Sequence, residues 1–115
     1  MKCLADNVYH EARGEPVKGQ MLVARVTLNR AKEYHSGDIC KAVYQKGQFS
    51  WTNGFTMNKP PKIFETETYA NAARAAYAAL WYHQPVYYFH ATYVKPEWAY
   101  KKKVVAKVGK HIFYA

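Results

Sequence analysis

The chain has 115 residues, half of them hydrophobic, which predicts a single domain over residues 1–115 with one modest core. Its 17 Lys and Arg residues outnumber 8 Asp and Glu residues, so the formal net charge of +9 favours a polyanionic partner: nucleic acid, an anionic cell surface or an acidic polymer. No apolar stretch is long enough for a secretory signal or a transmembrane span.

The first predicted element is a helix that ends before Pro16. Leu4, Val8 and Glu11 follow helical spacing on one face, so the Glu11 side chain is expected to point toward the core. Burial raises the pKa of a carboxyl, which makes Glu11 a candidate general acid. The alternative is a structural carboxylate paired with an arginine (Arg13, Arg25 or Arg30).

Glu15 is a possible second carboxylate. It lies between Gly14 and Pro16, so it is expected to be extended and to sit near the start of the next helix. There it could favour the helix dipole or accept a bond from a backbone N–H, and we prefer this structural interpretation to a catalytic one.

A second helix is predicted from Val17 to Ala31. Its apolar stripe comprises four residues, widened by two valines (Val17, Met21, Ala24 and Leu28, with Val23 and Val26). A turn at residues 36–38 follows, in which Asp38 is expected to cap a short helix through Val43 or Tyr44.

The remaining chain predicts a binding loop, a helix and short strands. Residues 45–62 contain two glycines and two prolines among aromatic residues, which is typical of a long ordered loop. An alanine-rich helix is predicted over residues 66–81. A strand is predicted over 86–91, and residues 104–108 and 111–114 form a hairpin around Gly109-Lys110. Helices first and strands last indicate an α+β fold.

The histidines and cysteines limit which metal sites and disulfide bonds the chain can form. His10-Glu11 begins like a zinc-protease motif, but Gly14 stands where its second histidine belongs. We therefore expect no metal and no cofactor. Cys3 and Cys40 are the only cysteines, and either one disulfide bond or two buried thiols fits the sequence.

Three blocks of the sequence together match one family. The first runs from Leu4-Ala5 through Glu11-Ala12-Arg13-Gly14-Glu15-Pro16 to Leu28-Asn29-Arg30. The second comprises Ile39-Cys40, Val43-Tyr44-Gln45 and Gln48-Phe49-Ser50-Trp51, and the third comprises Tyr88-Phe89-His90, Pro96-Glu97-Trp98 and Gly109-Lys110-His111-Ile112-Phe113-Tyr114. In these blocks the chain resembles the SleB-like family of spore-cortex-lytic cell wall hydrolases over essentially its whole length.

The resemblance implies a compact lysozyme-like domain, mainly helical with a small C-terminal antiparallel hairpin or sheet, that cuts peptidoglycan as a lytic transglycosylase. Glu11 would protonate the oxygen between N-acetylmuramic acid and N-acetylglucosamine. It would then take the proton of the muramic C6 hydroxyl as that oxygen closes onto C1, leaving a 1,6-anhydro end. The expected substrate-binding residues are Gln48, Ser50, Trp51, Tyr88, His90 and Trp98, whereas Phe49 is expected to anchor the loop in the core.

The resemblance also bears on the cysteines and the setting. Some relatives carry cysteines at similar places, so it favours a Cys3–Cys40 disulfide and an oxidising site of action. The expected partner is peptidoglycan rather than nucleic acid, and a monomer is expected. A minimal basic domain is similar to a phage endolysin, held in the host cytoplasm before it acts at the bacterial wall in the periplasm or outside the cell.

Two alternative functions stay open. A hydrolytic muramidase would use Glu15 or another carboxylate to activate water. A non-enzymatic module binding nucleic acid would use the +9 charge and the Lys101–Lys103 run, although no nucleic-acid motif accompanies them.

Overall fold

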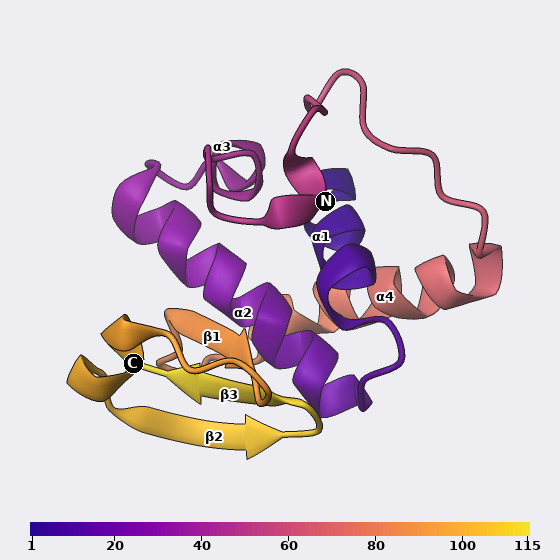
Figure 1. Cartoon of the computed structure of the whole chain (residues 1–115). Coiled ribbons are helices and arrows are strands. Elements are labelled where there is room, and N and C mark those ends of the chain that lie inside the picture. The colour runs from indigo at the N-terminus through magenta and orange to yellow at the C-terminus, as the bar shows by residue number, and fades with distance from the viewer.

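The computed structural model describes residues 1–115 and confirms the α+β fold class (Figure 1). Its helices are α1 (Lys2–Ala12), α2 (Val17–Tyr34), α3 (Ile39–Val43) and α4 (Thr66–Ala78), with short 3-10 turns η1 (Ser50–Thr52), η2 (Ala79–Trp81) and η3 (Glu97–Lys101). Its strands are β1 (Tyr88–Ala91), β2 (Val104–Val108) and β3 (His111–Tyr114). None of the helices combines the length and apolar character needed to cross a bilayer.

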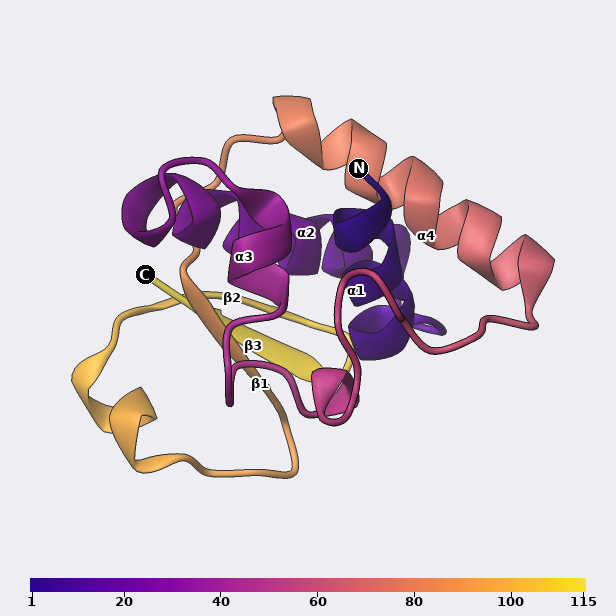
Figure 2. The same cartoon turned by 90° about the horizontal axis from the view of Figure 1, so that it is seen from above.

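The break between α1 and α2 follows the predicted signals. Arg13 leaves the helical conformation, Gly14 takes a left-handed φ of +88°, and Pro16 is the residue before the first turn of α2. A side chain would be strained at that φ, whereas glycine adopts it freely. The two helices then pack against each other and against α4, as the view from above shows (Figure 2).

The predicted buried stripe of α2 is confirmed in part, and the helix continues past Ala31 to Tyr34. Val17 is 66% exposed, and Met21 and Leu28 are only partly buried. The predicted residues Val23, Ala24 and Val26 enter the core, together with Leu22, which was not predicted. Helix α2 also buries Gln20, Arg25 and Thr27, so its buried face mixes polar and apolar residues and is not fully described by the apolar periodicity.

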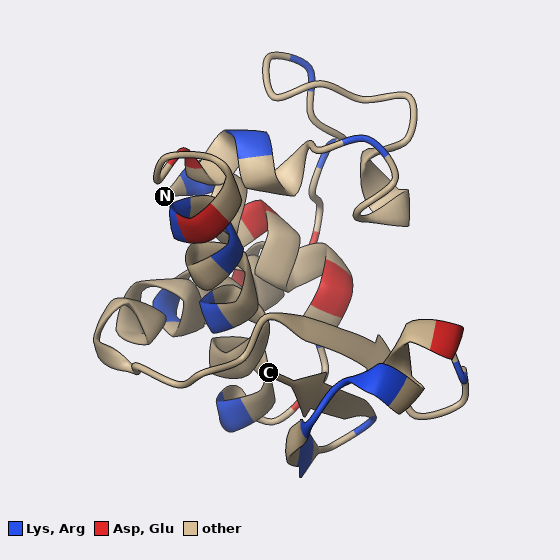
Figure 3. Ribbon diagram, turned by 90° about the vertical axis from the view of Figure 1, so that its left-hand side faces the viewer, with Lys and Arg blue, Asp and Glu red and all other residues tan.

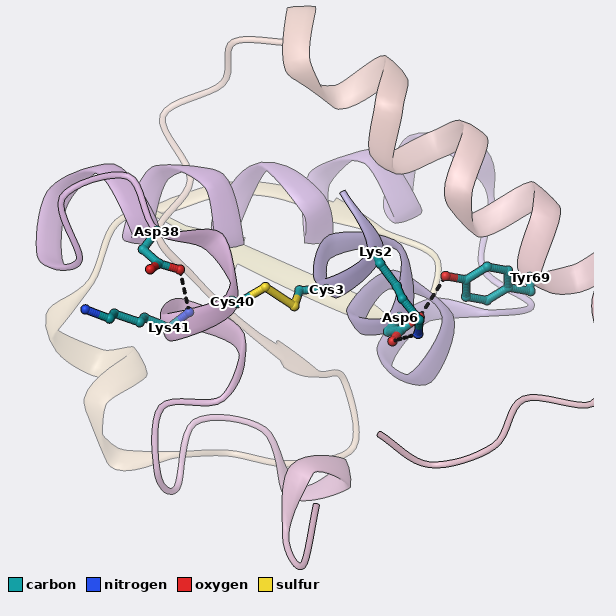
Figure 4. The surroundings of a disulfide bond; sticks show 7 residues. All are labelled: Lys2, Cys3, Asp6, Asp38, Cys40, Lys41 and Tyr69. Carbon is teal, nitrogen blue, oxygen red and sulfur yellow. Dashed lines mark hydrogen bonds and ion pairs between the residues drawn. A yellow bond between two sulfur atoms is a disulfide. The ribbon is translucent and has the colours of Figure 1, made fainter. Parts of the chain in front are cut away.

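A disulfide bond between Cys3 and Cys40 joins α1 to α3, which confirms the pairing favoured by the family resemblance (Figure 4). The two cysteines are 37 residues apart, and the loop-entropy model gives such a cross-link about 4 kcal/mol of stability. Beside it, the Asp38 carboxylate accepts a hydrogen bond from the Lys41 backbone N–H at 3.0 Å and caps α3 as predicted.

The three strands form an antiparallel sheet in the order β1-β3-β2, next to α2 (Figure 1). The predicted hairpin of β2 and β3 is confirmed with its Gly109-Lys110 turn. Strand β1 begins at Tyr88, two residues later than predicted. Val86 is fully buried, and its carbonyl accepts a hydrogen bond from the Asn29 side chain. This carbonyl is therefore bonded to α2 and not to a neighbouring strand.

Candidate active site

Glu11 lies in the last turn of α1, on the face that carries the fully buried Val8. Its side chain makes no hydrogen bond or ion pair, since each of the three arginines considered as partners is engaged elsewhere. Arg13 pairs with Glu65, Arg25 donates to Asn29 and a backbone carbonyl, and Arg30 donates to Gln48. The alternative that Glu11 is a structural carboxylate paired with an arginine is therefore not supported.

Burial alone perturbs this carboxyl. Desolvation raises the pKa of Glu11 to about 7, because the charged form loses hydration that no protein group replaces. At neutral pH a substantial fraction of Glu11 thus keeps its proton, as a general acid requires.

Glu11 opens onto a cavity of about 760 Å³ between the helices and the sheet. Residues from α1, α2, the loop before η1, β1, η3 and β3 all line it. The cavity brings together Glu11 and five of the six predicted substrate-binding residues (Gln48, Ser50, Tyr88, His90 and Trp98). No other Asp or Glu lines this cavity.

The loop side of the cavity is held by Arg30. Its guanidinium donates to the Gln48 side-chain oxygen at 3.2 Å and to the Tyr87 carbonyl at 3.5 Å. Because Gln48 accepts through its oxygen, its amide N–H groups remain for a ligand. Phe49, 4% exposed, packs against Phe89 and anchors the loop as predicted.

An aromatic cluster forms the opposite wall. The Trp98 ring meets the rings of Tyr88, His90 and Tyr114 at centroid distances of 5.3 to 5.6 Å. Both ring nitrogens of His90 are engaged, one with the Ala91 carbonyl and one with the Tyr114 hydroxyl, each at 2.7 Å. His90 therefore contributes a ring face to this wall, while its polar atoms hold the wall together.

Trp51 lies behind the cavity and does not line it. Its indole N–H donates to the Asn7 side-chain oxygen at 2.9 Å, and its ring stacks on His10 at a centroid distance of 4.3 Å. His10 does line the cavity, so Trp51 supports a lining residue from the protein side.

Glu15 also lies outside the cavity. Its Oε1 accepts a hydrogen bond from the Lys110 backbone N–H at 2.8 Å and is 3.7 Å from His111 Nδ1. Glu15 lines a separate hollow of about 990 Å³ formed with residues of α2 and α4. We place the site at the smaller cavity, because that one contains Glu11 and most of the predicted site residues.

The cavity is also lined by residues that were not among the predicted binding residues, and these include Arg30, Lys102 and His111. Burial lowers the pKa of His111, whose Nδ1 has no hydrogen-bond partner. His111 had a sequence signal, since it belongs to the closing block of the family resemblance. Lys102 had no such signal, because nothing in the sequence distinguishes it from the lysines on either side of it. No group of three or more His, Cys, Asp and Glu side chains is placed to hold a metal ion.

Sequence comparison gives one family match. The model of the Cell Wall Hydrolase family matches residues 14–114, a stretch that begins three residues after Glu11. Spore cortex-lytic enzymes are 26% identical over 114 residues in Bacillus subtilis (strain 168) and 32% identical over 117 residues in Halalkalibacterium halodurans. Each alignment covers 98% of this chain but only 36% and 34% of the relative, so the chain spans about a third of these proteins.

Two solved structures resemble the fold. The catalytic domain of the germination-specific lytic transglycosylase SleB from Bacillus anthracis superposes with a TM-score of 0.75 at 26% identity, covering 98% of this chain and 91% of that one. The catalytic domain of the Bacillus cereus SleB protein gives a TM-score of 0.74 at 26% identity, with 97% and 86% covered.

Proposed function

The chain belongs to the Cell Wall Hydrolase family, and from that premise we propose that it is a lytic transglycosylase of peptidoglycan with Glu11 as its catalytic acid and base. One observation carries the assignment of Glu11. It is the single carboxyl that lines the cavity, it has no protein partner, and its pKa is raised to about 7. The activity is the one that the B. anthracis structure is named for.

The reaction needs one proton held at the right place. Protonated Glu11 donates its proton to the glycosidic oxygen between N-acetylmuramic acid and N-acetylglucosamine, and the bond from that oxygen to muramic C1 breaks. The resulting Glu11 carboxylate accepts the proton of the muramic C6 hydroxyl as its oxygen bonds to C1. Glu11 is protonated again, a 1,6-anhydro ring has formed, and no water is consumed.

A lone carboxyl favours this route over hydrolysis. Glycoside hydrolysis ordinarily uses two carboxyl groups that flank the bond, one as acid and one as base or nucleophile. In this protein Glu15 is bound to the turn between β2 and β3 and lines a different hollow. In transglycosylation the nucleophile is the substrate's own hydroxyl, so a second carboxylate is not required.

The lining residues suit a sugar ligand. The free amide N–H groups of Gln48 and the hydroxyl of Ser50 are placed to bind N-acetyl and hydroxyl oxygens, and the rings of Tyr88 and Trp98 offer stacking surfaces. We assign His90 and Trp51 supporting roles, because their polar atoms are already engaged.

The test is mass spectrometry of the soluble fragments that the wild type, Glu11→Gln and Glu15→Gln release from purified peptidoglycan. Gln at position 11 keeps the size but cannot donate the proton, so anhydro-muropeptides should disappear. Gln at position 15 keeps an oxygen acceptor for Lys110, so Glu15→Gln serves as the matched control and should release the same anhydro products.

Two outcomes would contradict the proposal. Reducing-end fragments that depend on both glutamates would identify the hydrolytic muramidase instead. Absence of any released fragment from the wild type would refute the enzymatic assignment on this substrate.

The setting of the enzyme forms the remaining part of the proposal. We propose that it acts as a monomer at the bacterial cell wall, which light scattering and fractionation would test. Figure 3 shows Lys and Arg positions on several helices and loops rather than in one segment of the chain, which disfavours the nucleic-acid module. Endolysin-like use stays a prediction, to be tested by lysis of permeabilised cells.

A further inference from the structure

The active-site cavity contains two cations that both lie close to one aromatic ring. The Lys102 ammonium nitrogen is 4.2 Å from the centroid of the Tyr88 ring, and the Arg30 guanidinium carbon is 5.2 Å from the same centroid. All three side chains line the cavity. The ring thus holds both cations at the cavity wall through cation–π attraction.

Neither cation is neutralised by the protein. The ion pairs of the structure are Lys2–Asp6 and Arg13–Glu65, and the remaining close contact of this kind is between His111 and Glu15. None of them involves Arg30 or Lys102. The only carboxyl in the cavity is Glu11, which keeps much of its proton up to neutral pH. The cavity therefore carries unbalanced positive charge where substrate binds.

The two cations differ in what else they do. Arg30 already donates to Gln48 and to the Tyr87 carbonyl, so part of its hydrogen-bonding capacity serves the loop. The Lys102 ammonium has three donors, of which the Tyr88 side chain engages at most one. Lys102 is thus the better-placed donor for a ligand anion.

We infer that Lys102, assisted by Arg30, forms a subsite for a carboxylate of the peptide stem of peptidoglycan. This inference rests on the proposed function. The N-acetyl sugars themselves are neutral, whereas the stem carries carboxylates and starts from the lactyl group on O3 of muramic acid. That is the sugar whose C1 reacts, so a cation in the cavity of Glu11 faces the first residues of the stem.

The lysine run supplies its own matched control. Lys101 and Lys103 are exposed and do not line the cavity, whereas Lys102 is partly buried and does. Lys102→Met and Lys101→Met remove the same charge from adjacent positions. A general attraction between a basic protein and an anionic wall would weaken equally in both variants, but a specific subsite would weaken only in the first.

The experiment measures binding without cleavage, by co-sedimentation with purified peptidoglycan in a Glu11→Gln background. Two substrates are compared: native peptidoglycan, and the same material with its stem carboxylates converted to amides by carbodiimide and ammonium. Lys102→Met should raise the half-saturating concentration of native peptidoglycan by roughly three- to tenfold and leave that of the amidated material unchanged. Lys101→Met should follow its parent on both substrates, and Lys102→Arg should restore binding.

Equal losses of affinity for native peptidoglycan in Lys101→Met and Lys102→Met would overturn the subsite. It would also be overturned if Lys102→Met bound amidated peptidoglycan more weakly than native peptidoglycan by the same factor as its parent protein does. Fragment release by the protein with Glu11 intact is measured in parallel on native peptidoglycan. Release combined with either overturning result refutes the subsite alone, whereas no release refutes the proposed function and the subsite with it.

Discussion

Replacing Glu11 by Gln should stabilise the folded protein at neutral and alkaline pH. Burial raises the pKa of Glu11 from an ordinary value of 4.5 to about 7. The folded state therefore retains a proton that the unfolded state has already lost between these two pH values. A proton bound only in the folded state makes stability fall as pH rises, and each pKa unit corresponds to about 1.4 kcal/mol.

The magnitude follows from that shift. Glu11 contributes no pH-dependent difference below about pH 4.5, because both states are then protonated. Through the interval up to about pH 7 the wild type should lose about 3 kcal/mol relative to Glu11→Gln, and above it the difference should level off. Gln cannot ionise, so the variant lacks this loss.

The assay is urea unfolding of both proteins at pH values from 4 to 9 without reductant, followed by tyrosine and tryptophan fluorescence. The quantity compared is the difference between the free energies of unfolding of the two proteins. Other titrating groups, such as His10 and His111, contribute equally to both free energies, so their contributions cancel in the difference. Glu33→Gln, at an exposed position, is the control, and its difference from wild type should stay within about 0.5 kcal/mol. A Glu11→Gln difference that is flat over this range would refute the argument that desolvation perturbs Glu11.

Three further results are expected. The rate of fragment release should fall about tenfold per pH unit above about pH 7, as Glu11 loses its proton; initial rates between pH 5 and 9 measure this, and a rate still rising at pH 8.5 would contradict it. Trp51→Phe should cost about 1 to 2 kcal/mol in urea unfolding, because the buried Asn7 oxygen loses its donor, and a fall in activity at unchanged stability would instead place Trp51 in substrate binding. Replacing Cys3 and Cys40 together by Ala should lower the free energy of unfolding by about 4 kcal/mol and abolish the effect of dithiothreitol on Tm, whereas a wild type insensitive to the reductant would contradict this.

Features that depend on neighbours in the chain were predictable from the sequence. The Asp38 cap and the hairpin around Gly109-Lys110 arise from local turn chemistry and are confirmed. The helix predicted over residues 66–81 from periodicity is confirmed as far as Ala78, and residues 79–81 form the 3-10 turn η2. The inward position of Glu11 follows from the same helical spacing as Val8. The turn and helix preferences of a short segment are the same in isolation and in the folded protein, so the sequence is enough to predict these features.

Features that depend on contacts between distant segments were decided by the tertiary structure. The buried face of α2 was predicted only in part, because elements on more than one side also cover its polar residues. Glu15 is bound to Lys110, which is 95 residues away, so nothing beside it in the sequence indicates its partner. The sequence could place Lys102 only in a run of equivalent lysines, whereas the tertiary structure brings this one lysine to the cavity that Glu11 also lines. Periodicity reports which side of an element is apolar, but only the assembled fold determines which groups share a cavity.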